Sequence, residues 1–387
     1  MAAPAQTSST SVYAEFGLSP LVNASGIYTD LGGSCLSPTV WRAASEANRT
    51  WVAMPDLLDR TGHAIAEMIG AEAARVVPGA SAGLALAVAA CMTGDDGRLM
   101  EQLPASTGSR TDLLMQSGHR YKYTRCALMS GARLVEVGAV STTPSDIEEA
   151  LGPQVACVLH PVHLDGKPGT VPLKDVVRIA HRAGVAVVVD AAYMSYPTDL
   201  IGHYGRQGSD LVCFSAKYFW GPNAGGFVYG RKDLIRTVAA LDFTRFESGP
   251  HLVFGRAFKM DRATVVATTL ALREWLTMDH DGRWANYRAR AEKMLSELKQ
   301  RAEGTFEMVC FTLDERIVPE PVNSLFVTPS PSSGLTAIDL EQRLARGAPS
   351  VRAVAVGEGV SFCLETVFED QDAVLVDRVV GALAVPK

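Results

Sequence analysis

The segment "VAVVVDAA" (residues 185–192) decides the fold class, because its unbroken apolar and β-branched run is typical of a strand buried on both faces. Short apolar segments of this kind alternate along the chain with helical patterns. They include "VACVLH" (155–160), "LKDVVRIAHRAG" (173–184) and "DLVCFSA" (210–216). This alternation predicts an α/β fold, in which helices flank a mostly parallel central sheet.

The pattern changes after about residue 256, where long segments with apolar residues at helical spacing are followed by separate strands and helices. Such an order is typical of an α+β unit. We therefore expect an N-terminal arm over residues 1–40, a large α/β domain over 41–255 and a smaller C-terminal α+β domain over 256–387.

Composition limits the possible partners. The chain has 387 residues and a formal net charge of -6, which argues against a nucleic-acid partner. No apolar run reaches the roughly 18 residues of a membrane span. The seven cysteines are scattered and odd in number, so we expect neither a disulfide framework nor a structural metal site. A reducing, cytoplasmic location follows from this cysteine pattern.

A turn rich in small residues follows a strand in "VVPGASAGLALAV" (76–88) and opens a helix. Gly79, Ala80 and Ser81 would present backbone N–H groups there, and Ser81 adds a hydroxyl. Helix N-termini of this kind bind phosphate groups. The alternative is that the glycine serves packing alone. The segment is not a Walker A loop, since no G-K-[ST] follows.

Two charged residues follow strands further along the chain. Asp190 ends the strand at 185–190, and Lys217 follows the strand at 210–215 within "FSAKYFWGPNAGG" (214–226). Ligands in open parallel sheets bind at the carboxyl ends of the strands, so both residues are expected at one edge. Taken singly, Asp190 could be a loop anchor, and Lys217 could extend its amine into water.

Together these features predict a pyridoxal phosphate site. Lys217 would form a Schiff base with the aldehyde, and Asp190 would keep the pyridine nitrogen protonated. The turn at residues 79–81 would bind the 5′-phosphate, with Ser215 as a further hydroxyl donor.

The segment "FSAKYFWGPNAGGFVYGRKDLI" (214–235) resembles the lysine segment of fold-type I pyridoxal phosphate enzymes. It is most similar to the group that contains bacterial selenocysteine synthase and D-glucosaminate-6-phosphate ammonia-lyase. Further matching segments are "LVNASGIYTDLGGS" (21–34) and "GRAFKMDRATVVATTLALREW" (255–275). The lysine segment reads F-S-A-K, one residue shorter than the F-S-G-x-K usual in that group.

The resemblance implies roles for further residues. His119 would cover a face of the cofactor ring, and Arg352 would bind the substrate carboxylate. Alternatives are a histidine that binds backbone at a helix start and an arginine at a strand edge. Tyr123 could face the same pocket as His119 or pack in the core. Near the substrate we expect the following residues, for which turn or loop roles are the alternative: Asn23, Ser25, Tyr28 and His163.

We expect a pyridoxal phosphate enzyme that acts on a small amino acid or amino sugar acid through a carbanion at Cα. β-Elimination of the ammonia-lyase type is the favoured reaction, and a racemase, an aldolase or another transferase is the alternative. A binding or scaffold protein with this fold is the non-enzymatic alternative. Because the matching segments begin at residue 21, no room is expected for a tRNA-binding unit. We expect at least a homodimer.

Overall fold

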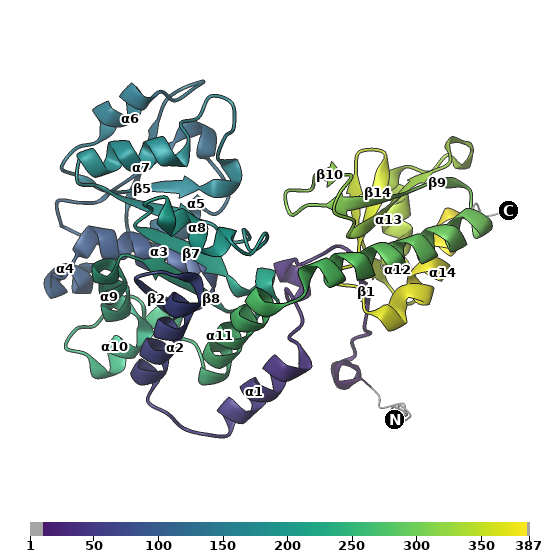
Figure 1. Cartoon of the computed structure of the whole chain (residues 1–387), viewed down its shortest axis with the longest axis horizontal. Helices are drawn as coiled ribbons and strands as arrows, with labels where there is room; N and C mark the ends of the chain where they lie inside the picture. The colour runs from purple at the N-terminus through teal and green to yellow at the C-terminus, as the bar shows by residue number, and fades with distance from the viewer. Residues whose placement is uncertain (1–10, 385–387) are drawn as a thin grey trace. The chain divides into compact units, whose positions relative to one another are not determined.

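The computed structural model describes residues 11–384, which form two compact units. The large unit spans residues 33–278, and the small unit comprises residues 279–384 together with 11–32 (Figure 1). Helix α11 (Arg262–Thr277) packs on α1 (Pro38–Asn48) and α2 (Met54–Ile69), and so belongs to the large unit. The predicted boundaries at residues 40 and 255 thus differ from this division, and residues 1–10 of the predicted arm lie outside the described residues.

A seven-stranded sheet forms the centre of the large unit. In spatial order its strands are β2 (Ala73–Val77), β8 (Gly226–Gly230), β7 (Leu211–Ser215), β6 (Ala186–Asp190), β5 (Val155–Pro161), β3 (Asp112–Gln116) and β4 (Arg133–Val137). Only β8 runs antiparallel to its neighbours. This order confirms the mostly parallel sheet that the sequence predicts.

Helices and short turns cover this sheet. The remaining α-helices of the large unit are α3 (Gly79–Thr93), α4 (Gly97–Gln102), α5 (Thr124–Ala127), α6 (Pro144–Ala150), α7 (Leu173–Arg182), α8 (Leu200–Arg206), α9 (Lys232–Leu241) and α10 (Phe243–Ser248). Its 3₁₀ turns are η3 (Ser117–His119), η4 (Leu128–Ser130), η5 (Val162–Leu164), η6 (Ala216–Phe219) and η7 (Arg256–Phe258). Helix α3 is apolar on every side because it packs against the central strands β5 to β8 and is almost wholly buried.

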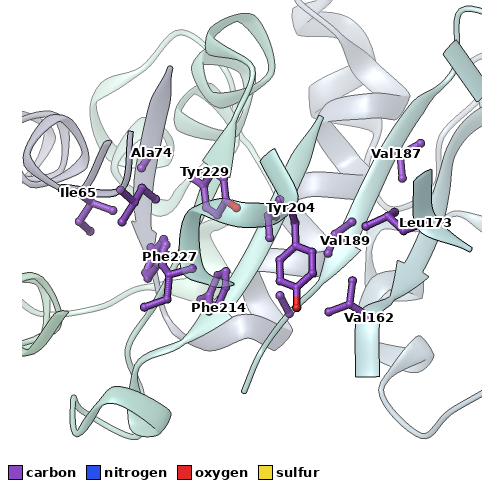
Figure 2. Close-up of a cluster of buried hydrophobic side chains, with 14 of the residues drawn as sticks. Ile65, Ala74, Val162, Leu173, Val187, Val189, Tyr204, Phe214, Phe227 and Tyr229 are labelled. Atoms are coloured by element: carbon purple, nitrogen blue, oxygen red, sulfur yellow. The ribbon is translucent and has the colours of Figure 1, made fainter. Parts of the chain in front are cut away.

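The central strand β6 is buried on both faces, as its sequence predicts. Val187 and Val189 belong to the hydrophobic cluster that contains Phe214 and Phe227 (Figure 2). Val188 points to the other face and packs in the cluster that contains most of α3. Alternating side chains of one strand therefore enter two separate cores.

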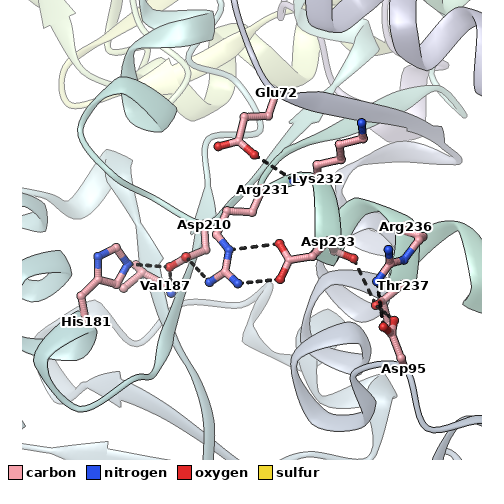
Figure 3. Close-up of polar contacts among 10 residues, drawn as sticks. All are labelled: Glu72, Asp95, His181, Val187, Asp210, Arg231, Lys232, Asp233, Arg236 and Thr237. Carbon is pink, nitrogen blue, oxygen red and sulfur yellow. Dashed lines mark hydrogen bonds and ion pairs between the residues drawn. The ribbon is translucent and has the colours of Figure 1, made fainter.

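The edge of the sheet at the amino ends of the parallel strands is held by charged groups. Asp210 is 2% exposed and accepts hydrogen bonds from the backbone N–H of Val187 (2.7 Å) and from Arg231 Nη1 (3.0 Å) (Figure 3). His181 Nε2 lies 2.9 Å from the same carboxylate. Because these charged groups bond to one another, we assign this edge a structural role. The chemistry predicted from the sequence lies at the opposite edge.

The small unit is an α+β structure, as predicted. Its antiparallel sheet has the order β10 (Ile317–Val318), β9 (Gly304–Phe311), β11 (Ser324–Pro329), β14 (Gly359–Cys363) and β13 (Val354–Val356). Its helices are α12 (His280–Arg301), α13 (Ala337–Arg346) and α14 (Asp372–Leu383), with 3₁₀ turns η1 (Val12–Phe16), η2 (Thr29–Leu31), η8 (Pro331–Ser333) and η9 (Glu369–Gln371). The strands β1 (Val22–Asn23) and β12 (Val351–Arg352) pair in parallel. Within residues 11–384, no helix is both long and apolar enough to cross a bilayer.

Candidate active site

The carboxyl ends of the parallel strands bring the predicted site residues of the large unit to one edge of the sheet. Gly79 follows β2, His119 follows β3, His163 follows β5, Asp190 ends β6 and Lys217 follows β7. The reversed strand β8 begins at the same edge, because its first residue pairs with the last residues of β2 and β7. These five residues therefore lie along a single edge of the sheet.

Asp190 is a buried carboxylate with two neutral hydrogen-bond donors. It is 4% exposed, its Oδ1 accepts the backbone N–H of Ala192 (3.0 Å), and its Oδ2 accepts the hydroxyl of Tyr121 (2.5 Å). Burial raises the pKa of Asp190 above its ordinary value, while the bonds from Tyr121 and Ala192 and the nearby His163 act in the opposite direction. A cationic group beside Asp190 would stabilise its charged form.

Lys217 is carried on a turn that the neighbouring structure fixes. Its side chain is buried, and its Nζ lies 4.8 Å from the centre of the Tyr218 ring. The Ser195 hydroxyl donates to the backbone carbonyl of Tyr218 (2.6 Å), and Trp275 Nε1 donates to the carbonyl of Ser195 (2.8 Å). Trp220 ends the turn in the left-handed region at φ 56°, which few non-glycine residues adopt. The backbone beside Lys217 is therefore held in one conformation.

The start of α3 is suited to an anion. No side chain caps this helix, and Gly79 adopts a φ of +84° that favours glycine. A Cβ on Gly226 would lie 2.9 Å from Gly79 Cα, and one on Gly225 would lie 2.2 Å from Thr268 Oγ1. The close approach of Gly226 to Gly79 leaves no room for a side chain there, and the N–H groups of the first turn and the exposed Ser81 could bind a phosphate.

His119 is completely buried and neutral. Burial is the main reason that its pKa falls to about 4, and the adjacent His160 lowers it further, while Asp165 and the carbonyl of Leu164 oppose the fall only partly. The centres of the His119 and His160 rings are 4.6 Å apart, and the rings are nearly perpendicular at 84°. The His119 ring is wholly covered by protein atoms, so contact with a cofactor ring would need a rearrangement at this edge, and the predicted role stays a prediction.

His163 lies in an aromatic row beside Asp190. Its ring centre is 5.3 Å from that of Tyr121 and 5.6 Å from that of Tyr193. Sequence reasoning missed Tyr121 and considered Tyr123, which is 44% exposed. The segment between η3 and α5 has no regular period, so spacing alone could not show which tyrosine turns toward Asp190.

The remaining predicted substrate residues lie in the small unit. Asn23 Oδ1 accepts the backbone N–H (3.1 Å) and the hydroxyl (2.9 Å) of Ser25, and these are contacts of a local turn. The hydroxyl of Tyr28 donates to Glu315 (3.1 Å). Arg352 is exposed and, with Ser25, Tyr28 and Glu315, lines a cavity of about 290 Å³. Their role in substrate binding stays a prediction.

A larger cavity of about 620 Å³ lies beside β2, α2 and α9, and none of the predicted site residues lines it. The side chains that carry the predicted chemistry converge elsewhere, at the carboxyl ends of the parallel strands. In the described part of the chain, no group of three or more His, Cys, Asp or Glu side chains could hold a metal ion.

Comparison with known proteins identifies the family. The family model of L-seryl-tRNA selenium transferase matches residues 21–316, which is most of the chain. The chain belongs to the L-seryl-tRNA selenium transferase family. The matched range, residues 21–316, includes every predicted site residue except Arg352. The resemblance stated from the sequence is therefore confirmed.

Two relatives have the same sequence identity to this chain. The chain is 31% identical to 5′-C-glycyluridine monooxygenase-decarboxylase from a Streptomyces species, over 89% of this chain and 84% of that protein. It is also 31% identical to D-glucosaminate-6-phosphate ammonia lyase from Salmonella typhimurium, over 68% of this chain and 70% of that protein.

Solved structures of related enzymes have the same fold as this chain. The structure of D-glucosaminate-6-phosphate ammonia-lyase matches with a TM-score of 0.83 and 26% identity, covering 96% of this chain and 98% of that chain. Serine palmitoyltransferase from Sphingomonas wittichii matches with a TM-score of 0.53 at 13% identity, covering 94% and 87%, and shows likeness of fold alone. The fold is that of fold-type I pyridoxal phosphate enzymes, as predicted.

Proposed function

We propose that this chain is a pyridoxal phosphate-dependent enzyme that acts on a small amino acid or amino sugar acid through a carbanion at Cα. β-Elimination of the ammonia-lyase type is the favoured reaction. The observation that carries the proposal is that Asp190, Lys217 and the uncapped start of α3 meet at one edge of the sheet. The family and the ammonia-lyase relative support it.

The residues present fit the cofactor. The first turn of α3 and Ser81 would bind its phosphate, with Ser215 as a further donor, and Lys217 Nζ would bind its aldehyde carbon. Asp190 would accept a hydrogen bond from the protonated ring nitrogen and gain a positive partner that its bonds from Tyr121 and Ala192 do not supply. When bound, pyridoxal phosphate supplies an electron sink that stabilises negative charge at Cα.

The protein's own groups would perform the proton transfer and the orientation. Lys217 Nζ is the acid and base proposed to act at the substrate Cα. His119, buried and neutral, would cover one face of the cofactor ring, and His163 would lie near the ring or the substrate. Arg352 would bind the substrate carboxylate, with Asn23, Ser25 and Tyr28 as further proposed contacts.

Oxidative decarboxylation is a second candidate reaction, because the decarboxylase relative matches more of the chain than the lyase does. Purified protein loaded with pyridoxal phosphate would be screened against amino acids and amino sugar acids by changes in visible absorbance. β-Elimination releases ammonia and needs no oxygen. Oxidative decarboxylation releases CO2 and consumes O2. Absence of any spectral change with added cofactor would contradict the proposed function itself.

We also propose a small-molecule substrate rather than a nucleic acid, a cytoplasmic location and assembly into at least a homodimer. The net charge of -6 supports the first of these, because a protein that binds tRNA by its phosphates needs a basic surface. Light scattering would measure the assembly, and a tRNA mobility shift at physiological salt would contradict the small-molecule proposal.

The hydroxyl of Tyr121 is expected to set the pH range of activity. Its bond to Asp190 lowers the pKa of a carboxyl that burial raises, so Tyr121→Phe should raise that pKa further. Activity needs the ionised carboxylate, and is lost as the pH falls through this pKa. The acidic limb of the kcat/KM profile should therefore move to higher pH, while the alkaline plateau changes little. Tyr123→Phe is the matched control, and an identical acidic limb in both variants would exclude the proposed role.

Arg352 is proposed to bind the substrate carboxylate through its planar, two-pronged guanidinium group. Arg352→Lys keeps the charge but loses the paired hydrogen bonds, so we expect KM to rise and kcat to fall together. A loss of ~1.4 kcal/mol in transition-state stabilisation would lower kcat/KM by roughly tenfold. Arg346→Lys in α13 is a control, since that side chain is bonded to Gln342. Unchanged constants in Arg352→Ala would show that another group binds the carboxylate.

A further inference from the structure

Four half-buried aromatic rings form a row along the carboxyl edge of the large sheet. In the order of the strands β7, β6, β5 and β3 that they follow, its members are Tyr218, Tyr193, His163 and Tyr121. From Tyr218 to Tyr121, successive ring centres lie 5.8, 5.6 and 5.3 Å apart. This aromatic row therefore crosses four neighbouring strands without a break.

The aromatic row connects two groups that are proposed to bind the cofactor. At one end, Tyr121 donates its hydroxyl to Asp190 (2.5 Å). At the other end, the ring centre of Tyr218 lies 4.8 Å from Lys217 Nζ. His163 lies between these ends and is close enough to Asp190 to lower the pKa of its carboxyl. A flat ring bound to Asp190 at one point and to Lys217 at another would extend along the row.

The strand register places this end of the site on the same face of the sheet as helix α3. Asp190 pairs with Cys213 of β7, and paired residues on neighbouring strands point to the same face. Cys213 packs in the hydrophobic cluster that contains most of α3, and Tyr121 packs against the same cluster. Asp190, Tyr121 and the proposed phosphate site at the start of α3 thus share one face.

We propose that His163, in the middle of the aromatic row, contacts one face of the pyridoxal phosphate ring. This inference rests on the proposed function and deepens it, because that function leaves His163 near either the ring or the substrate. The His163 side chain is half-buried, so part of its surface is open to a ligand without any rearrangement. Aromatic pairs of this kind stabilise a complex beyond the area that they bury.

The test measures cofactor binding with two readouts that need no substrate. One is the Kd of pyridoxal phosphate from fluorescence quenching, and the other is the circular dichroism of its visible band, which reports a fixed ring orientation. His163→Ala removes the flat face, so we expect the Kd to rise about three- to tenfold, as for the loss of one aromatic contact. The visible dichroism should fall.

Two further variants separate the ring contact from other effects. His163→Phe keeps a flat ring but no polar atoms, so its Kd and dichroism should stay close to those of the parent. The control is His181→Ala, which removes a histidine that lies 2.9 Å from Asp210 at the opposite edge of the sheet. It should leave both readouts unchanged.

A measurement on the parent protein applies even if His163→Ala does not fold. The chain has eight histidines, whose rings can be labelled selectively with ¹³C for NMR. The signal that disappears in His163→Phe belongs to His163. Addition of pyridoxal phosphate should shift this signal through the ring current of the cofactor, while the signal of His181 stays in place.

The outcomes distinguish the inference from the proposed function. A His163 signal that does not shift, in a parent whose visible band shows bound cofactor, would overturn the ring contact. A folded His163→Ala protein with the parent's Kd and dichroism but a higher KM would also overturn it, and would place His163 at the substrate. A His163→Phe protein as impaired as His163→Ala would show that polar atoms act, not the face. A parent protein that binds no pyridoxal phosphate would instead overturn the proposed function.

Discussion

Lys217→Ala should abolish the covalent attachment of pyridoxal phosphate and lower turnover by about 10³-fold or more, since the same amine is the proposed acid and base at Cα. The structure favours a specific function for this lysine over a solvated one, because its side chain is buried on a fixed turn at the sheet edge shared with Asp190. Borohydride reduction followed by peptide mass spectrometry would locate the cofactor on the parent protein, and single-turnover kinetics would measure the rate.

Two variants serve as controls for this prediction. Lys217→Arg keeps a positive charge but has no nucleophilic amine, so it should lose covalent attachment as Lys217→Ala does. Lys232→Ala removes an exposed lysine at the opposite edge of the sheet and should behave like the parent. A reduced cofactor found on any lysine other than Lys217 would remove this residue from its proposed role.

The fold was predictable because its central feature is local. The apolar run before Asp190 identifies a strand with two buried faces, and the structure shows Val188 and Val189 in separate cores. The reversal of β8 was not predicted, although the chain contains a reason for it. Only residues 216–225 separate β7 from β8, and a parallel connection needs a crossover of a dozen or more residues.

The candidate site was predictable to the extent that strand ends determine it. Asp190 ends a strand, and Gly79 and Lys217 each lie two residues after one, so sheet topology alone brings them to one edge. Tyr121 and Asp165 lie in segments without a regular period, and their contacts depend on side-chain direction. No pattern of apolar spacing encodes that direction, and only the structure shows which carboxylate and which ring each one meets.

Replacement of Asp190 is the second large effect that we expect. Asp190→Asn keeps the shape of the side chain but loses the charge that would hold the ring nitrogen protonated. A hydrogen bond to a charged group contributes about 1.5–3 kcal/mol, so kcat should fall roughly 10- to 100-fold and cofactor affinity should weaken. Asp199→Asn, at an exposed aspartate beyond the same strand, is the matched control. Stopped-flow measurement of Cα deprotonation would test the rate, and an unchanged rate would exclude Asp190 from the mechanism.

Asp190→Asn, which should lower activity, should not lower the stability of the folded protein when no cofactor is bound. Burial raises the pKa of Asp190 in the folded state, so the folded chain binds more protons than the unfolded chain, and this residue's contribution to stability falls as the pH rises through that pKa. Asp190→Asn has no charge to bury, so the cofactor-free variant should melt at or above the parent's temperature at pH 8. Added pyridoxal phosphate should then raise the melting temperature of the parent more than that of the variant. A variant that melts lower without cofactor would mean that Asp190 serves the fold, because a carboxylate kept for binding costs stability until its cationic partner arrives.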